Sequence, residues 1–449
     1  MNIAIQNVVR EIDFGSSLTA DSDTAAKYFE DADAALRSLG PPSSRSGDAK
    51  RDAQDIKVRS RLIKEQFLRR HVGAIYDTAT DKRTRTLRVC DLLTVADRFP
   101  GLVPTRQRIH GERALQLQSA KEGFEIDQGL FIAHILADPE RGLHLVHAML
   151  KPRREALEKL DEFQKNGVVE LGEARVERQG HAGHVTLSNP TFLNAEGDRT
   201  AADLEIAVDL ALLDDRIEVC VLRGGTVDHP KYNGRRIFNS GINLTHLYYG
   251  QIAFADFILE RELGQLNKIY RGHWRSDSYS EQFEDNVEKP WLAAVESHAI
   301  GGGCQLLCVM DRVVAVHGSY FNLPASKEGF IPGSANLRLP RLVGIQLARQ
   351  GIFFERKFMA DTPEGQMICD EAVTYEQMDD AIEANTAQMI RAGFTSTVSN
   401  RKALRVGQEP LAVYRRHIAT YARQQALCFY DPKLIDNLEH SWQPSSRRM

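Results

Sequence analysis

HAIGGGCQLLCVMDRVVAV, residues 298–316, places three consecutive glycines immediately before an apolar segment. We expect a helix to begin at Gly301, Gly302 and Gly303. The first N–H groups of a helix have no partner inside it, and glycine lets a ligand approach the backbone closely. The triplet therefore predicts a cradle for an anion or an oxyanion, with close packing of helix on strand as the alternative. A dinucleotide-binding loop is disfavoured, because Leu306 stands where that fingerprint has a small residue.

A second glycine-containing turn lies upstream in RRIFNSGINLTHL, residues 235–247, after the strand-like IEVCVLRGG. Gly241 allows the chain to turn there, and the turn exposes the backbone amide of Ile242. Two amides, one from Ile242 and one from the glycine triplet, would form an oxyanion hole if they converged on one oxygen. The two turns together are the first candidate site.

Strand-like and helical segments alternate around these turns, which predicts an α/β core over residues 171–345. Each expected strand is a short run rich in apolar and β-branched residues. The expected strands are GHVTLSNP, IEVCVLRGG, PWLAAVES, DRVVAVHG and SYFNLP, and the expected helix between the first two is TAADLEIAVDLALLDD.

Helical periodicity dominates on both sides of this core. Residues 1–170 form an expected N-terminal helical region, with apolar spacings of three and four in RLIKEQFLRRHVGAIY and DQGLFIAHILADPERGLHLVHAML. Its first 50 residues are polar and expected to be partly flexible, and they end in the loop-forming LGPPSSRSGDAK. Residues 346–449 form an expected C-terminal helical region.

The composition narrows the class of protein. The 449 residues carry a net charge of −4, so there is no electrostatic reason to expect a nucleic-acid partner. The sequence has neither the apolar run of a membrane span nor the basic and apolar start of a signal peptide. Its six cysteines form no C-x-x-C pair. We therefore expect a cytoplasmic protein with reduced thiols and no membrane partner.

Four segments resemble the crotonase, or enoyl-CoA hydratase/isomerase, family. They are VTLSNPTFLNA, VLRGG with FNSGINL, HAIGGGCQL, and FNLPASKEGFIPGSANLRLPRLVG. The resemblance implies an α/β fold with a ββα-spiral core, an acyl-CoA thioester substrate, and a homo-oligomer that is a trimer or a hexamer. It assigns the oxyanion hole to the amides of Ile242 and Gly302, beside Gly303.

The chain departs from the family where hydratases carry two glutamates. Gln305 stands at the first of these positions, and Ala325, after Pro324, stands at the second. Neither side chain performs general acid–base chemistry, so simple hydration is not expected. Glu328, three residues beyond Ala325, would restore hydratase or isomerase chemistry if its carboxylate reached the pocket.

These replacements and the long helical N-terminal region resemble a branch of the family that oxidises arylacetyl-CoA thioesters. The likeness implies cleavage by O2 to an arylglyoxylate and free CoA, with O2 and the thioester as substrates and no cofactor. Arg261 would bind a phenolic oxygen and Gln305 a hydroxyl of the same ring. Glu196 is a polar residue of the ring pocket and a candidate base, and Ile331 belongs to the same substrate pocket.

The loop HPKYNGRR, residues 229–236, lies just before the first oxyanion turn, where the family places CoA contacts. A solvated basic loop is the alternative explanation. Asn243 replaces the aspartate that is usual in the family. The candidate CoA-binding residues are His229, Lys231, Tyr232, Arg235, Ser240, Gly241 and Asn243.

Other reactive side chains have simpler explanations. Cys304 with His298 as its base would form a nucleophile, but small buried cysteines are common in helices that pack on sheets. The histidine pairs in HLVH and HAGH lack the accompanying ligands of a recognisable zinc pattern, so no metal site is expected.

Three classes of function stay open. A metal-free dioxygenase is first, and another crotonase-type enzyme, such as an isomerase, decarboxylase or thioester hydrolase, is second. A non-catalytic acyl-CoA-binding scaffold is third. Oxygen uptake separates the first class from the other two, since CoA release without oxygen indicates a hydrolase and binding without turnover indicates a scaffold.

Overall fold

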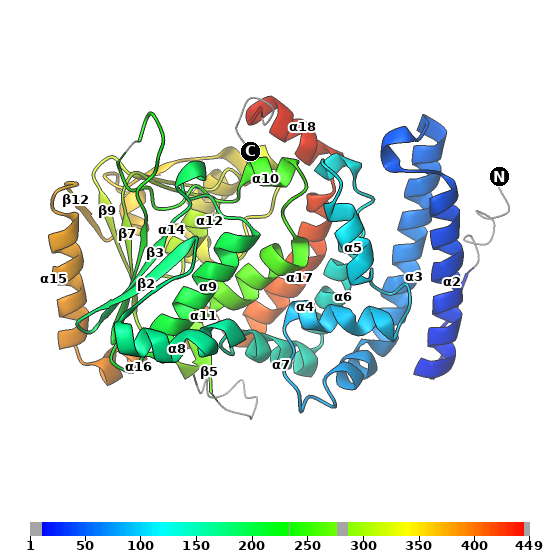
Figure 1. Cartoon of the computed structure of the whole chain (residues 1–449), viewed down its shortest axis with the longest axis horizontal. Coiled ribbons are helices and arrows are strands. Elements are labelled where there is room, and N and C mark those ends of the chain that lie inside the picture. The colour runs from blue at the N-terminus through cyan, green and yellow to red at the C-terminus, as the bar shows by residue number, and fades with distance from the viewer. Residues whose placement is uncertain (1–10, 233, 276–285, 444–449) are drawn as a thin grey trace.

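The computed structural model describes residues 11–232, 234–275 and 286–443 of the chain. Figure 1 shows an elongated molecule with the large sheet at one end and the long helices α2 (Leu18–Ser38) and α3 (Gly47–Ala79) at the other. Helix α17 (Leu411–Phe429) lies between them. Within the described ranges, no helix combines the length and the apolar character that a membrane crossing requires.

A seven-stranded sheet forms the centre of the α/β core. Strands β1, β2 and β3 are antiparallel, and the sheet continues from β3 with parallel strands. Parallel strands need crossover connections, and both candidate turns lie in such crossovers, one after β4 and one after β7. Because β4 and β7 are parallel neighbours, the segments that follow them begin at the same end of the sheet. In sheet order the strands are β1 (Val168–Glu170), β2 (Ala174–Gln179), β3 (Ala182–Leu187), β4 (Val219–Gly224), β7 (Trp291–Val295), β9 (Arg312–Val316) and β12 (Glu371–Val373).

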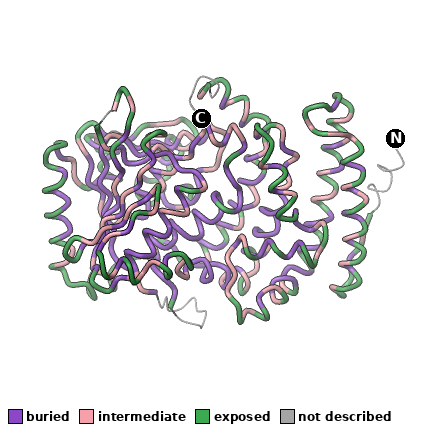
Figure 2. Tube along the Cα trace, in the orientation of Figure 1, coloured by how far each residue is buried: buried purple, intermediate pink, exposed green. Residues whose placement is uncertain are grey.

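Helices cover both faces of this sheet, which explains why β7, one of its central strands, is apolar and buried along its whole length. On one face, Leu222 of β4 shares a core with α9 (Asp198–Leu213). On the other face, Val221 packs with residues of α15 (Met378–Arg391). Figure 2 shows the strands buried along most of their length, whereas α15 at the edge of the molecule is largely exposed on its outer side.

A smaller, three-stranded sheet holds the glycine triplet. Its strand β8 is parallel to β10, and Gly301 N donates a hydrogen bond to Asn322 O at 2.8 Å. The chain leaves β8 through the glycines directly into α12 (Gly302–Leu307), so the helix predicted at this point is confirmed. The three strands are β11 (Phe358–Met359), β10 (Tyr320–Asn322) and β8 (His298–Ile300).

The N-terminal region is helical, as predicted. The loop expected over LGPPSSRSGDAK is shorter than predicted, because Ser46 caps α3 by accepting a hydrogen bond from Ala49 N, and the helix begins at Gly47. Asp138 and Pro139 start a new helix inside the long periodic segment 127–150. The remaining helices of this region are α4 (Val89–Leu92), α5 (Arg106–Arg113), α6 (Glu125–Ala137), α7 (Pro139–Met149) and α8 (Arg154–Asn166).

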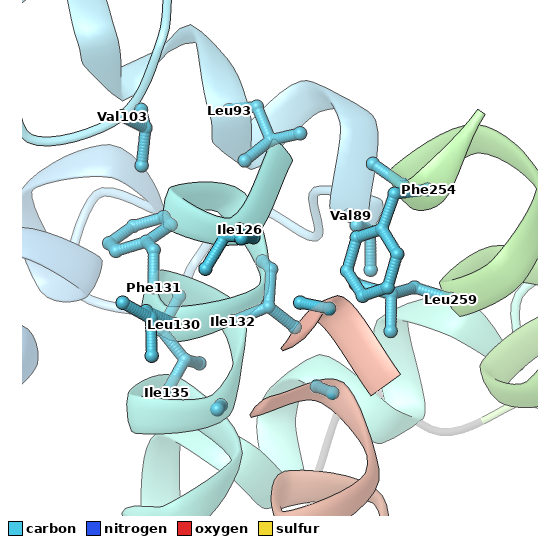
Figure 3. Packing of buried hydrophobic residues seen from close by; sticks show 14 of the residues in the cluster. Val89, Leu93, Val103, Ile126, Leu130, Phe131, Ile132, Ile135, Phe254 and Leu259 are labelled. Atoms are coloured by element: carbon cyan, nitrogen blue, oxygen red, sulfur yellow. The ribbon is translucent and has the colours of Figure 1, made fainter. Parts of the chain in front are cut away.

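The N-terminal helices share one hydrophobic core with segments far away in the sequence. Figure 3 shows Phe131 and Ile132 of α6 in the same cluster as Phe254 and Leu259. Tyr414 of α17 belongs to this cluster as well. Residues from all three predicted regions therefore bury their apolar surfaces together.

Buried ion pairs also join the N-terminal region to the α/β core. The carboxylate of Glu205, on α9, accepts from Arg88 Nη2 at 2.9 Å and from Arg153 Nη1 at 3.2 Å. Lys268 Nζ lies 2.8 Å from the same carboxylate. Burial favours the neutral acid, but these three cations together hold the pKa of Glu205 well below its usual value.

The close contact between α6 and α17 predicts that a larger residue at the interface would lower the stability of the protein. A β-carbon on Gly129 of α6 would lie 2.5 Å from Ala426 Cβ and 2.8 Å from Ala422 O. We expect Gly129→Ala to lower the free energy of unfolding by about 1–3 kcal/mol through overpacking, as measured by urea denaturation. Gly111→Ala is the matched control, because a β-carbon there meets nothing within 4 Å. Equal stability of the two variants would contradict this account of the interface.

Candidate active site

A cavity that is partly open to solvent lies between the α/β core and α17. Its wall includes Glu196, Ile242 and residues within 257–262. The rest of the wall consists of the glycine turn, the loop within 323–332 and two side chains of α17. The cavity therefore brings both predicted turns to one place.

Ile242 is held in position by a parallel bridge to Glu196. Glu196 N donates to Gly241 O at 2.7 Å, and Asn243 N donates to Glu196 O at 2.7 Å. These hydrogen bonds use the groups that flank Ile242, so its own N–H faces away from Glu196. Gly241, with a φ of 81°, lies against the glycine turn, and a β-carbon on it would be 3.3 Å from Gly302 N.

The backbone amides of Ile242 and Gly302 are free donors. Neither N–H has an acceptor among the residues that the structure describes, and both residues line the cavity. Two backbone donors on one cavity are what an oxyanion hole requires. The predicted approach of the two turns is thus present, and the role of the two amides stays a prediction.

Two glycines of the triplet shape the turn that carries the free amide. Gly301 has a φ of 52° and a ψ of −112°, which residues with a side chain rarely adopt. A β-carbon on Gly302 would lie 2.8 Å from both Arg261 Nη2 and Glu196 Oε1. Glycine at 302 is therefore required for the close approach of a buried ion pair.

That ion pair is the electrostatic centre of the site. Arg261 Nε donates to Glu196 Oε2 at 2.7 Å, and Arg261 Nη2 donates to Glu196 Oε1 at 2.8 Å. Both side chains are almost fully buried. Burial disfavours the charge on Arg261, but Glu196, with Glu262 nearby, raises the pKa of the guanidinium above its usual value. The cavity is therefore lined by a permanent, paired positive charge.

Gln305 extends the same array. Arg261 Nη1 donates to Gln305 Oε1 at 2.7 Å, and Arg261 Nη2 also donates to Gly302 O at 2.9 Å. The Gln305 oxygen is thus engaged, which leaves its amide nitrogen as the group available to a ligand. The three predicted ring-binding residues, Glu196, Arg261 and Gln305, form one connected cluster in the structure.

Asn239 joins this cluster to both turns and was missed by the sequence analysis. Its Nδ2 donates to Glu196 Oε1 at 2.8 Å, and its Oδ1 accepts from Gly241 N at 2.6 Å. A β-carbon on Gly303 would lie 2.7 Å from Asn239 O, so close packing explains the third glycine. The Glu196 carboxylate accepts from Asn239 and Arg261 together, an arrangement that suits a counter-ion better than a base.

Apolar side chains and α17 form the rest of the wall. Ile331 lines the cavity as expected, and its N–H donates to Gln425 Oε1 at 2.8 Å. Phe257 and Ile258 contribute from a π-helical segment, η5 (Phe254–Leu259). Tyr421 and Gln425, one helical turn apart on α17, bring a hydroxyl and an amide to the cavity. No motif in the sequence marked these two residues.

Two carboxyl groups of the wall differ in their surroundings. Glu262 accepts from Ser334 N at 3.0 Å and from Ser334 Oγ at 2.6 Å. Glu328 also lines the cavity, so the carboxylate considered in the sequence does reach the pocket, and a group able to transfer protons is present there. In the described part of the chain this carboxyl group has no hydrogen-bond or ion-pair partner. Glu328 is half-buried, and the loss of hydration within the wall raises its pKa to about 8, an effect to which Glu355 adds and which Lys327 opposes.

The predicted CoA residues lie around the first turn, on a basic and aromatic surface. Lys231 Nζ is 5.0 Å from the ring centre of Tyr232, which is 5.9 Å from the ring of His298. His298 is 5.6 Å from the ring of Tyr320, and Lys357, a residue the sequence analysis missed, is 4.6 Å from that ring.

The other predicted CoA residues have mixed environments. The ring of His229 is 5.7 Å from that of Tyr232, and Arg235 is exposed. Ser240 Oγ donates to Leu193 O at 2.7 Å, and Asn243 caps α10 (Leu244–Tyr248) by accepting from His246 N at 3.0 Å. The structure explains Ser240 and Asn243 as turn-forming residues, and CoA binding by this loop stays a prediction.

Cys304 is unsuited to nucleophilic chemistry. It is fully buried, and burial raises its pKa well above the usual value. His298 lies against Ser240 Oγ at 2.9 Å, and burial, with Lys231 and Lys357 nearby, lowers its pKa to about 4. No group of three or more potential metal-ligating side chains occurs in residues 11–232, 234–275 and 286–443.

A family model described as enoyl-CoA hydratase/isomerase matches residues 177–422. The chain belongs to the enoyl-CoA hydratase/isomerase family. Both glycine turns and the cavity loop lie inside the range matched to this family, whereas the whole N-terminal helical region, residues 1–170, precedes it.

Individual members of the family differ in how much of the chain they match. A (3,5-dihydroxyphenyl)acetyl-CoA 1,2-dioxygenase of Amycolatopsis orientalis is 43% identical over 416 residues, which cover 92% of this chain and 94% of that protein. A short-chain-enoyl-CoA hydratase of Clostridium acetobutylicum is 28% identical over 195 residues, 43% of this chain and 66% of the hydratase. The likeness to the dioxygenase therefore extends through most of the N-terminal helical region.

A solved structure confirms the fold of the family. An enoyl-CoA hydratase from Mycobacterium avium subsp. paratuberculosis superposes with a TM-score of 0.50 at 16% identity. The superposition covers 62% of this chain and 99% of the hydratase. The predicted crotonase-type α/β core with helical regions on both sides is confirmed.

Proposed function

We propose that this protein is a dioxygenase that converts 3,5-dihydroxyphenylacetyl-CoA and O2 to 3,5-dihydroxyphenylglyoxylate and free CoA, without a metal or an organic cofactor. One observation carries the proposal: the free amides of Ile242 and Gly302 share a cavity with the buried Arg261–Gln305 cluster. The two amides can donate hydrogen bonds to a thioester oxygen, and the Arg261–Gln305 cluster can bind the hydroxyl groups of an aromatic ring. The dioxygenase from Amycolatopsis orientalis, 43% identical, supports the same assignment.

The first step is loss of a proton from the carbon between the ring and the thioester. The resulting enolate oxygen is stabilised by the two amides, which donate hydrogen bonds without giving up a proton. Arg261 and the amide nitrogen of Gln305 hold the ring hydroxyls, so the ring is oriented to share the negative charge. Ala325 presents only a methyl group at the position where a hydratase carries its second glutamate, so that position supplies no acid or base.

The electron-rich carbon then reacts with oxygen. One electron passes from the carbanion to O2, and recombination of the two radicals forms a peroxide at that carbon. The peroxide attacks the thioester carbonyl and expels CoA as the thiolate. The same carbon then loses its second proton as the O–O bond breaks, which leaves the ketone and the carboxylate, and the thiolate takes up one of the two released protons. Phe257, Ile258 and Ile331 supply apolar walls that limit the access of water to these species.

The proposal also covers the binding of the CoA moiety and the oligomeric state of the protein. Lys231 and Lys357, with the aromatic rings between them, suit the phosphates and adenine of CoA. The protein is further proposed to be a homo-oligomer, a trimer or a hexamer.

Oxygen consumption tests the proposed function. Chelator-treated protein with 3,5-dihydroxyphenylacetyl-CoA in an oxygen-electrode cell is expected to consume one O2 for each CoA released, because both oxygen atoms enter the acid. The chelator is expected to have no effect on the rate. Release of CoA under nitrogen would instead identify a thioester hydrolase, and binding without turnover would identify a scaffold.

A further inference from the structure

We propose that Glu328 is the base that removes the proton from the carbon between the ring and the thioester. The inference rests on the proposed function, because that reaction begins with this proton. It adds a catalytic residue that lies outside both glutamate positions of the hydratases. The geometry of the cavity wall supports this assignment.

Glu328 and Ala325 lie three residues apart on one short helix, α13 (Ala325–Glu328), and both line the cavity. Side chains with this spacing project from the same face of a helix. The small methyl group of Ala325 leaves space at the position where a hydratase carries a glutamate. The longer side chain of Glu328 therefore has room to approach a substrate whose thioester oxygen is bound by Ile242 and Gly302.

The other carboxylates of the wall are committed to protein partners. Glu196 accepts hydrogen bonds from Arg261 and Asn239, and Glu262 accepts two from Ser334. Considering only the described residues, Glu328 is the carboxyl group of this cavity that has no such partner. An uncommitted carboxylate keeps its lone pairs available for a proton from the substrate.

The surroundings of Glu328 also strengthen it as a base. Burial raises its pKa to about 8, with Glu355 as a second contribution and Lys327 as an opposing one. Arg261, Glu196 and Glu262 also line the cavity, but they are bound to one another or to other groups. A carboxylate whose pKa lies near the working pH accepts a proton more readily than a solvated one.

The proposed step is balanced without a further reactant. The C–H bond breaks, its proton forms an O–H bond on the Glu328 carboxylate, and its electron pair remains in the enolate. No oxidant is needed until O2 reacts with this enolate. Proton removal is therefore separable from oxidation by experiment.

Exchange of hydrogen for deuterium under nitrogen tests the assignment. Wild-type protein with 3,5-dihydroxyphenylacetyl-CoA in D2O is expected to place deuterium at the acidic carbon, as followed by mass spectrometry. Glu328→Gln is expected to slow this exchange by at least about 100-fold, because an amide is not a general base. The control Glu376→Gln removes an exposed carboxylate that neither lines the cavity nor contributes to the pKa of Glu328, and it is expected to exchange at the wild-type rate within about twofold.

The pH dependence gives an independent readout. The base acts in its ionised form, so the wild-type exchange rate is expected to rise with pH and level off above about 8. This rise is expected to disappear in Glu328→Gln. The folded protein keeps this proton to higher pH than the unfolded chain does. The contribution of Glu328 therefore lowers the free energy of unfolding as pH rises from the usual pKa of a glutamate, 4.5, towards about 8. Glu328→Gln is therefore expected to melt no lower than wild type at pH 8.

The outcomes separate this inference from the proposed function. Wild-type exchange rates in Glu328→Gln, together with undiminished oxygen uptake, would overturn the role of Glu328 and leave the dioxygenase intact. Exchange that depends on Glu328 in a protein that consumes no O2 would support Glu328 as the base and overturn the dioxygenase. If Glu328→Gln does not fold, Glu328→Asp is expected to keep a slower, pH-dependent exchange, and a wild-type rate in that variant would contradict the assignment.

Discussion

Gly302→Ala is expected to lower kcat by about 100- to 1,000-fold, the usual cost of losing one oxyanion donor. The added β-carbon would lie 2.8 Å from Arg261 Nη2 and from Glu196 Oε1. These atoms are the ends of two side chains that are bound to each other and buried, so they cannot move aside without breaking the ion pair. The turn must shift instead, and the Gly302 amide shifts with it.

Steady-state kinetics with the arylacetyl-CoA would check this expectation. Because the main effect is on a charge that develops during the reaction, kcat is expected to fall far more than the affinity for the CoA thioester changes. Gly407→Ala in α16 (Phe394–Gln408) is a matched control, since a β-carbon there meets nothing within 4 Å. A Gly302→Ala variant with wild-type kcat would remove the glycine turn from the mechanism.

Arg261→Met is expected to abolish measurable turnover and to lower the free energy of unfolding by about 3–5 kcal/mol. The substitution removes the ring-binding cation and leaves the Glu196 carboxylate buried without its main partner. A buried charge without a counter-ion is costly because it has lost its hydration. Oxygen uptake and urea denaturation measure the two effects separately.

The double variant Glu196→Gln/Arg261→Met tests the reason for the instability. Neither charge remains in it, so most of the lost stability is expected to return. Activity is not expected to return, because the ring-binding cation is still missing. Equal instability of the single and double variants would show that packing around Arg261, rather than the unpaired carboxylate, determines the stability.

The two glycine turns could be predicted from the sequence because each lies within a short stretch. The glycines at 241, 301, 302 and 303 indicate turns from the local sequence alone, without any knowledge of the tertiary structure. The expected strands β3, β4, β7, β9 and β10 are confirmed for a similar reason, since each is a short apolar run. Strands β1 and β2 were missed, because polar residues such as Arg175 and Glu177 face solvent on this side of the sheet.

The remaining parts of the cavity depend on contacts that no local pattern reveals. Asn239 matters because its amide bridges Glu196 and Gly241, and an asparagine in a turn has many simpler explanations. Tyr421 and Gln425 lie more than 100 positions beyond the glycine triplet in the sequence. The periodicity of their helix indicates that one face is buried, but it does not indicate what that face contacts. The availability of Glu328 is visible only when the partners of Glu196 and Glu262 are known.

The position of α17 also has a consequence for the order in which the molecule can be completed during synthesis. Arg415 Nη1 donates to Ala137 O at 3.0 Å, and Gln118 Nε2 donates to Phe429 O at 3.1 Å. Helix α6 therefore leaves the ribosome almost 300 residues before the helix that covers it. Until then, the apolar face of α6 is open to water, to chaperones and to other nascent chains. A helix translated long after α6 thus closes both the N-terminal core and the cavity, so a chain terminated before α17 would lack both.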